Sequence, residues 1–216
     1  MAEGLVIIGA GGFGREVLDI IEAIEATGHN LGFVGFLDDG EVDHDRLTRR
    51  GARLLGTTDE FLQFANRYVI GIGSPQTKAR IAERLDSLGG MAEKLVHPMA
   101  TIGGDTQLEE GCIIAAGARI TTNIRLGKHV HIHVNATVGH DSTIGDFSSV
   151  LPGATVGGES SIEDEVLVGT GANVLNRMTI GQHSRVGAGA VVTRNVPSEI
   201  TVIGVPAKPR DRIESR

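Results

Sequence analysis

The stretch TVGHDSTIGDFSSVLPGATVGG, Thr137 to Gly158, places an aliphatic residue at every sixth position. The same period runs without a break through the second half of the chain, where the residues that carry it are Ile102, Leu108, Ile114, Ile120, Leu126, Ile132, Val138, Ile144, Val150, Val156, Ile162, Val168, Val174, Ile180, Val186 and Val192. A period of six fits neither an α-helix nor the simple alternation of a strand. The repeat itself therefore determines the fold of this half.

Small residues follow the aliphatic ones in a fixed register. Four positions after most of them stands a small side chain, and this set is Thr106, Cys112, Ala118, Ala136, Ser142, Ser148, Ala154, Ser160, Ala172, Ser184 and Ala190. Side chains two positions apart on a strand share a face, so we expect both sets to point inward. Such hexads predict a triangular parallel β-solenoid of about five coils, with about 18 residues in each.

The first half of the chain alternates strand and helix signals instead. GLVIIGAGGFGREVLDIIEAIEATG (residues 4–28) reads as a strand, a glycine turn and an amphipathic helix, and LGFVGFLDD (31–39) reads as a second strand. RYVIGIGSPQTKARIAERLDSLGG (67–90) repeats the strand, turn and helix. We expect a small Rossmann-like α/β domain with a parallel sheet over residues 1–96. The solenoid is expected over 97–204, with a terminal cap over 205–216 that covers its open end.

Composition narrows the classes of partner. A net charge of −7 argues against nucleic acid or an anionic membrane as the main partner. A single cysteine, Cys112, excludes an intrachain disulfide and fits a cytoplasmic protein. No apolar run approaches the roughly 20 residues that a membrane-spanning helix needs, and the start of the chain lacks the basic region of a signal peptide. We therefore expect a cytoplasmic protein.

Hexads of the form [LIV]-G-x-x-[STA]-x resemble those of the left-handed β-helix, or hexapeptide-repeat, acetyltransferases. Five motifs narrow the resemblance, namely VIIGAGGFGREV, FLDD, GIGS, GHDSTIGDF and VIGVPAKP. They are similar to those of enzymes that N-acetylate nucleotide-linked amino sugars and of the related sialic-acid O-acetyltransferases. The resemblance covers nearly the whole chain. It implies a left-handed solenoid, acetyl-CoA as co-substrate, and a homotrimer with active sites between subunits.

A histidine and an acid interrupt the regular scaffold at His140 and Asp141. His140 comes two positions after the inward Val138, so it is expected at a corner, where two polar residues need no function. The resemblance implies instead a catalytic pair, in which His140 is the general base and Asp141 stabilises the imidazolium. The resemblance also assigns the amide of Gly158, one predicted coil further along, to the acetyl carbonyl, where an oxyanion develops.

The same resemblance places the acetyl-CoA groove along the solenoid. Besides Gly158, it implies Ser149, Thr170 and Ala188 as lining residues, and Lys208 near the phosphates of CoA. Relatives often carry a second histidine where this chain has Ser149. His131, one predicted coil earlier on the same outward face, is a candidate to replace that imidazole.

A glycine loop follows the first predicted strand. Gly9, Gly11 and Gly14 match G-x-G-x-x-G, which on its own indicates NAD binding. The α/β domain ends near residue 96, however, which is too short for a full dinucleotide fold. Amides at a helix N-terminus hold any pyrophosphate. We therefore predict a sugar-nucleotide site at this loop.

The predicted sugar-nucleotide site has three parts. Gly11, Gly12 and Phe13 are expected beside the diphosphate or sugar. Asp38 and Asp39 are expected toward the base or ribose, and Gly73 lines the pocket. Many relatives carry histidine at the position of Phe13, so this residue bears on the identity of the substrate.

A metal site is a further possibility that the pattern argues against. In HVHIHV (129–134), His131 and His133 flank the inward Ile132 and are expected to face outward together. The related γ-carbonic anhydrases bind zinc on this scaffold with three histidines, two of them five positions apart, and no histidine pair here has that spacing. We predict no metal.

The function expected from the sequence is transfer of acetyl from acetyl-CoA to the amino group of a nucleotide-linked amino sugar. Two alternatives stay open at this point. One is O-acetylation of a sialic-acid-like sugar, and the other is a non-catalytic sensor of sugar nucleotides. The sequence leaves open which nucleotide and which sugar are bound.

Overall fold

A computed structural model describes residues 4–210. Of these, residues 4–98 with Glu110–Ile113 form one compact unit, and residues 99–109 with 114–210 form a second. The proposed cap over 205–216 is described as far as residue 210, and its last six residues lie outside the described part of the chain. No helix within residues 4–210 has both the length and the apolar character needed to cross a bilayer.

The first unit is built on a parallel sheet of order β3-β2-β1-β4-β5. The strands of this unit are β1 (Leu5–Ile8), β2 (Phe33–Leu37), β3 (Leu54–Gly56), β4 (Arg67–Ile70), β5 (Met91–Ala92) and β6 (Leu95–Val96). Its helices are α1 (Gly12–Glu25), α2 (His44–Thr48), the 3-10 helix η1 (Thr58–Glu60), α3 (Phe61–Phe64) and α4 (Pro75–Ser87). All four residues of the central strand β1 are buried, as in a parallel sheet covered on both faces. The expected α/β unit is confirmed.

Three glycines allow the end of the central strand β1 to pack closely against α1, the helix that follows it. A Cβ at Gly14, in α1, would overlap the carbonyl oxygen of Gly9. A Cβ at Gly71, after β4, would come within 2.6 Å of the Cα of Gly14. Gly9 also has a φ of +97°, which side-chain-bearing residues rarely adopt. Two glycines of the G-x-G-x-x-G motif are therefore required for packing.

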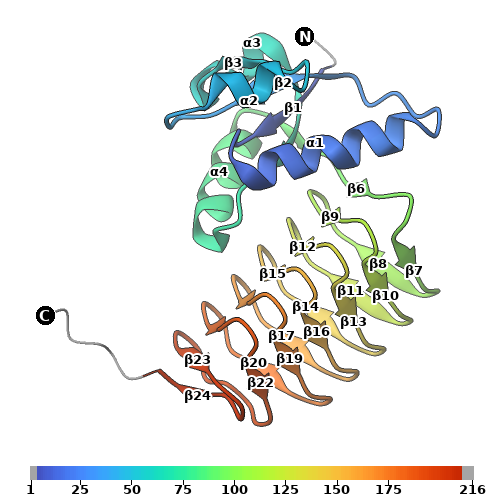
Figure 1. The fold of residues 1–216 in the computed structure, drawn as a ribbon, viewed down its shortest axis with the longest axis vertical. Helices are drawn as coiled ribbons and strands as arrows, with labels where there is room; N and C mark the ends of the chain where they lie inside the picture. The colour runs from blue at the N-terminus through green and yellow to red at the C-terminus, as the bar shows by residue number, and fades with distance from the viewer. Residues whose placement is uncertain (1–3, 211–216) are drawn as a thin grey trace, which may run out of the picture. The chain divides into compact units, whose positions relative to one another are not determined.

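The second unit is a solenoid with three sheets, seen in Figure 1 as a stack of triangular coils. The six-stranded sheet contains β7 (Thr101–Ile102), β10 (Arg119–Ile120), β13 (Thr137–Val138), β16 (Thr155–Val156), β19 (Asn173–Val174) and β22 (Val191–Val192). The five-stranded sheet contains β8 (Thr106–Leu108), β11 (Ile124–Leu126), β14 (Thr143–Ile144), β17 (Ser161–Ile162) and β20 (Thr179–Ile180). The third sheet runs β24-β23-β21-β18-β15-β12-β9-β6 and contains β9 (Ile113–Ile114), β12 (His131–Ile132), β15 (Ser149–Val150), β18 (Leu167–Val168), β21 (Arg185–Val186), β23 (Thr201–Ile203) and β24 (Lys208–Pro209).

The register of these sheets follows the hexads. Thr137 pairs with Arg119 on one side and with Thr155 on the other, so neighbouring strands are one 18-residue coil apart. The inward aliphatic residues are buried, except at the start, where Ile102 is 36% exposed and Leu108 is half-buried. The fold expected from the repeat is confirmed.

Each corner of the solenoid turns through a left-handed backbone conformation. Every sixth residue from Asp105 to Gly189 has a φ between +52° and +71°. Glycine fills some of these positions, and residues with side chains, including Asn123 and Asp141, fill the others. The conformation is costly for most residues, so its regular recurrence reflects the geometry of the coil.

The last coil departs from the hexads. Arg185 pairs with Thr201, so this coil is shorter by two residues than those before it. The chain then turns back, and β24 pairs antiparallel with β23 through Ile203 and Lys208. Instead of leaving the solenoid, the start of the proposed cap extends one of its sheets and pairs the terminal strand of that sheet.

Candidate active site

His140 lies in the turn between β13 and β14, where the backbone is held by the coils on both sides. The amide of Asp141 donates to the carbonyl of Thr122 over 3.1 Å, and the carbonyl of His140 accepts from the amide of Glu159 over 2.7 Å. Ser142 adds to this, because its Oγ donates to the carbonyl of Gly157 and accepts from the next coil. The position of the His140 backbone is therefore set by the solenoid.

The side chains of His140 and Asp141 contact each other at the surface. Nδ1 of His140 lies 2.6 Å from Oδ2 of Asp141, and the two side chains are 52% and 47% exposed. An ionised carboxylate only accepts hydrogen bonds, so Nδ1 carries the hydrogen and Nε2 is the nitrogen that can accept a proton. The hydrogen bond from His140, followed by one from Asn123, holds the pKa of Asp141 below its usual value.

Asn123, in the coil before, binds the other oxygen of this carboxylate. Its Nδ2 donates to Oδ1 of Asp141 over 2.6 Å. Asn123 and Asp141 occupy equivalent left-handed corners, with φ values of +54° and +60°. Asn123 is not among the site residues predicted from the sequence, although its separation from Asp141 by one coil was a usable signal.

Gly158 lies beneath the imidazole of His140. A Cβ at Gly158 would come within 2.7 Å of Nε2 and 2.9 Å of Cε1. Gly158 itself is buried. The absence of a side chain at Gly158 makes room for the imidazole ring of His140. This role for Gly158 is not among those predicted from the sequence.

A second charged pair continues the same row of corners. Glu159 follows Asp141 by one coil, and Arg177 follows Glu159 by another. Nε and Nη2 of Arg177 each donate to a carboxylate oxygen of Glu159 over 3.0 Å. This pairing holds the pKa of Glu159 below its usual value.

Apart from Gly158, the residues expected around acetyl-CoA lie on other parts of the solenoid. Thr170 and Ala188 are exposed, one coil apart, directly after β18 and β21, and Lys208 is exposed in β24. His140 occupies a different corner, between β13 and β14. Within one chain, Thr170, Ala188 and Lys208 are therefore not gathered around His140, whereas Gly158 lies against its ring.

Ser149 is fully buried, so it does not line an open groove in the chain as described. Its partners in the neighbouring strands are His131 and Leu167, whose larger side chains flank a short one. His131 is also fully buried, and His133 is only 6% exposed. Both histidines are therefore covered, which an outward position on a solenoid strand allows, and their shared outward direction stays a prediction.

The histidine rings in this region pack against other rings. The ring of His131 meets that of His133 edge to face, with 6.2 Å between centroids, and His129 stacks on Phe147 at 5.4 Å. Within residues 4–210, no group of three or more metal-ligating side chains is placed to hold an ion.

In the first unit, loops from neighbouring strands meet at the carboxyl ends of β1, β2 and β4. The strand order reverses between β1 and β4, which is where ligands bind in open parallel sheets. No described atom lies within 4 Å of an ideal Cβ at Gly11, Gly12 or Gly73. Phe13 is half-buried in the first turn of α1. Unlike Gly9 and Gly14, these three glycines border open space.

Asp38 and Asp39 make different contacts. Oδ2 of Asp38 accepts from the amide of Ala10 in the glycine loop over 2.7 Å. Asp39 instead accepts from the amide and hydroxyl of Thr58, at 2.7 Å and 2.9 Å from Oδ1. The structure thus brings Asp38 to the glycine loop and fixes Asp39 on the start of η1. The expectation that both acids turn toward a nucleotide stays a prediction, with the carboxylate of Asp39 held by Thr58.

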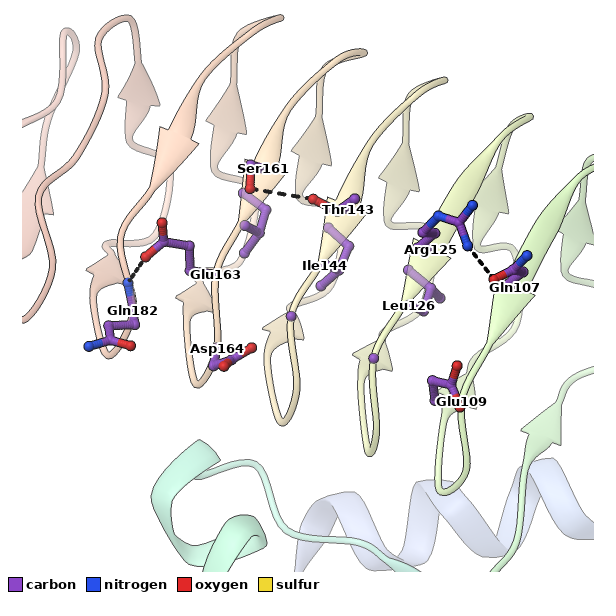
Figure 2. A pocket seen from close by; sticks show the side chains of 13 residues that line it. Gln107, Glu109, Arg125, Leu126, Thr143, Ile144, Ser161, Glu163, Asp164 and Gln182 are labelled. Carbon is purple, nitrogen blue, oxygen red and sulfur yellow. Dashed lines mark hydrogen bonds between the residues drawn. The ribbon is translucent and has the colours of Figure 1, made fainter.

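The five-stranded sheet carries a surface cavity of about 450 Å³ on its outer face. Figure 2 shows its side chains stacked from strand to strand, with Thr143 bonded to Ser161 and Arg125 to Gln107. Glu109, Glu163 and Asp164 also line it. None of the candidate site residues predicted from the sequence lines this cavity.

Residues 4–85 match the model of the PglD N-terminal domain. The chain is 32% identical over 156 residues to GDP-perosamine N-acetyltransferase from Escherichia coli O157:H7, an alignment that covers 68% of this chain and 66% of that protein. The chain thus spans slightly less than two thirds of the length of this relative.

Two solved structures match almost the whole chain. The acetyltransferase domain of PglB from Neisseria gonorrhoeae FA1090 is 28% identical, with a TM-score of 0.82 over 97% of this chain and all of that one. A mutant of perosamine N-acetyltransferase from Caulobacter crescentus, in complex with CoA and GDP-perosamine, is 26% identical, with a TM-score of 0.70 and 98% of each chain covered. The resemblance drawn from the hexads and motifs is confirmed.

The first unit thus matches the PglD N-terminal domain, and the chain as a whole is similar to acetyltransferases of known structure.

Proposed function

We propose that this protein transfers acetyl from acetyl-CoA to the amino group of a nucleotide-linked amino sugar, with His140 as general base. The observation that carries the proposal is the contact of His140 Nδ1 with Asp141, which leaves Nε2 as the proton acceptor above a side-chain-free Gly158. The relatives are consistent with it, since one is named as a GDP-perosamine N-acetyltransferase and another holds CoA and GDP-perosamine.

In this proposal, Nε2 takes a proton from the sugar's amino group as the nitrogen forms its bond to the acetyl carbon. Asp141 stabilises the imidazolium that results, because its negative charge lies against Nδ1. The carbon–sulfur bond of the thioester then breaks, and the imidazolium returns the proton to the CoA sulfur. The amide of Gly158 is assigned to the carbonyl oxygen on which negative charge develops.

The first unit is assigned the sugar nucleotide. The open surface at Gly11, Gly12 and Gly73 leaves room for a ligand, and amides at the start of α1 suit a diphosphate. Phe13 stands beside it, and Asp38 is assigned to the ribose or base. Asp39 is left out of this set, because its carboxylate is held by Thr58.

The solenoid is assigned acetyl-CoA, in a groove between neighbouring subunits of a homotrimer. Thr170 and Ala188 line that groove with Gly158, and Lys208 reaches the phosphates. The separation of Thr170, Ala188 and Lys208 from His140 within one chain supports a site completed by a second subunit. Light scattering at the assay concentration tests this, and a monomer with full activity would exclude the shared site.

The function is tested by measuring release of the CoA thiol from acetyl-CoA. The acceptors to compare are GDP-perosamine, a UDP-linked 4-amino sugar and free sialic acid. Nucleotide-dependent release with an amino sugar, and an N-acetyl product by mass spectrometry, is the expected result. Release with free sialic acid alone would favour O-acetylation, and no release with any acceptor would favour the non-catalytic sensor.

A further inference from the structure

We infer that Asn123 is a positioning residue for the proposed acetyl transfer, because its carboxamide holds one oxygen of Asp141 so that the other stays on Nδ1 of His140. The inference rests on the proposed function and adds a residue to it. It concerns a side chain one coil away from the pair, which would not touch either substrate.

The geometry divides the two oxygens of Asp141 between two donors. Oδ1 accepts from Nδ2 of Asn123 and Oδ2 contacts Nδ1 of His140, each over 2.6 Å. Asp141 is about half exposed, so packing alone does not fix its carboxylate. The second hydrogen bond supplies that restraint, and a fixed carboxylate in turn fixes the tautomer and direction of the imidazole.

The neutrality of the Asn123 carboxamide matters as much as its position. Asp141 faces three groups, which are His140, Asn123 from the coil before, and Glu159 from the coil after. Glu159 is itself bonded to Arg177. Because a carboxamide is neutral, Asn123 orients the Asp141 carboxylate without cancelling its charge. That charge remains available to stabilise an imidazolium.

The backbone offers a clean substitution at this position. Asn123 has a φ of +54°, and glycine occupies the equivalent left-handed corners at Gly117 and Gly153. Asn123→Gly thus removes the carboxamide and adds no backbone strain. Asn135→Gly is the matched control, because Asn135 occupies the same kind of corner, with a φ of +57°.

We expect Asn123→Gly to lower kcat about tenfold, the scale of one hydrogen bond to a charged group, with both KM values changed less than about twofold. Asn135→Gly should leave kcat within about twofold of the wild type. In the Asp141→Asn background, adding Asn123→Gly should lower kcat no further, because the contact between Asn123 and the Asp141 carboxylate is already changed. An undiminished kcat in Asn123→Gly, or the same tenfold loss in that background, would overturn the inference.

A second readout needs no substrate. Titration of the Asp141 carboxyl carbon by NMR should give a higher pKa in Asn123→Gly than in the wild type, because a hydrogen bond to the ionised form has been lost. The Asn135→Gly variant should titrate like the wild type. An inactive wild type would count against the proposed function, and the titration would then decide the inference alone. An unchanged pKa in Asn123→Gly would overturn it.

Discussion

The imidazole of His140 lies over the backbone of Gly158, so closely that a Cβ on this glycine would come within 2.7 Å of Nε2. The two residues occupy equivalent positions in successive coils, next to the paired strands β13 and β16. The 18-residue register of the repeat thus places Gly158 against Nε2, the atom proposed to accept the proton.

Gly158→Ala is therefore expected to displace the imidazole. The ring is exposed and can move, so we expect a fall in kcat of about tenfold or more, with a free energy of unfolding within about 1 kcal/mol of the wild type. Gly104→Ala is the control, because Gly104 occupies the same column of the solenoid and no described atom lies within 4 Å of its ideal Cβ. Equal activity in the two variants would show that the position of the ring is not critical.

Asp38 and Asp39 are adjacent in sequence but are expected to behave differently. Asp38→Ala should raise KM for the sugar nucleotide about tenfold and KM for acetyl-CoA less than about twofold, since Asp38 holds the amide of Ala10 in the glycine loop. Asp39→Ala should leave both KM values unchanged and lower the free energy of unfolding by about 1 kcal/mol, because Thr58 loses its acceptor. Equal effects of Asp38→Ala on both substrates would contradict its assignment.

The rate profile should depend on pH through the charge of Asp141. Its pKa is held below the usual value, first by His140 and then by Asn123, so the carboxylate is ionised wherever an imidazole changes its charge. In Asp141→Asn the imidazolium loses that neighbouring charge. The acid limb of kcat against pH should therefore move to lower pH, with a smaller loss of turnover than in His140→Ala.

The pH dependence of stability checks independently that Asp141 is ionised beside His140. The folded pKa of Asp141 lies below its unfolded value of about 3.9. Asp141 therefore stabilises the folded protein above about pH 3.9, and this stabilisation is lost as the pH falls through the folded pKa. The difference in Tm between wild type and Asp141→Asn should therefore shrink below about pH 4. A difference that grows with acid would contradict the ionised pair.

The repeat made much of this arrangement predictable. Once the hexads from Ile102 to Val192 establish the coil, any residue can be placed beside those 18 positions away, and Gly158 was placed near His140 in this way. The same step applied to Asp141 identifies Asn123 and Glu159, so these were accessible from the sequence. The regular left-handed corners follow from the same periodicity.

Other features depend on contacts that the period does not encode. Ser149 and His131 are in outward register, and yet both are fully buried in the folded chain. The carboxylate of Asp39 is taken by Thr58, which lies in a separate element of the first unit. The short last coil that pairs Arg185 with Thr201 breaks the period itself. Each of these is a tertiary effect that local sequence does not record.

The most direct test of the account is the turnover of His140→Ala under saturating acetyl-CoA and amino-sugar nucleotide. His183→Ala is the matched control, since His183 is also a corner histidine whose Nδ1 faces a carboxylate, that of Glu165, at 3.4 Å. We predict that His140→Ala lowers kcat about 10²- to 10⁴-fold with an unchanged fold, while His183→Ala stays near the wild type. Near-normal turnover in a folded His140→Ala protein would contradict the assignment of His140 as the general base.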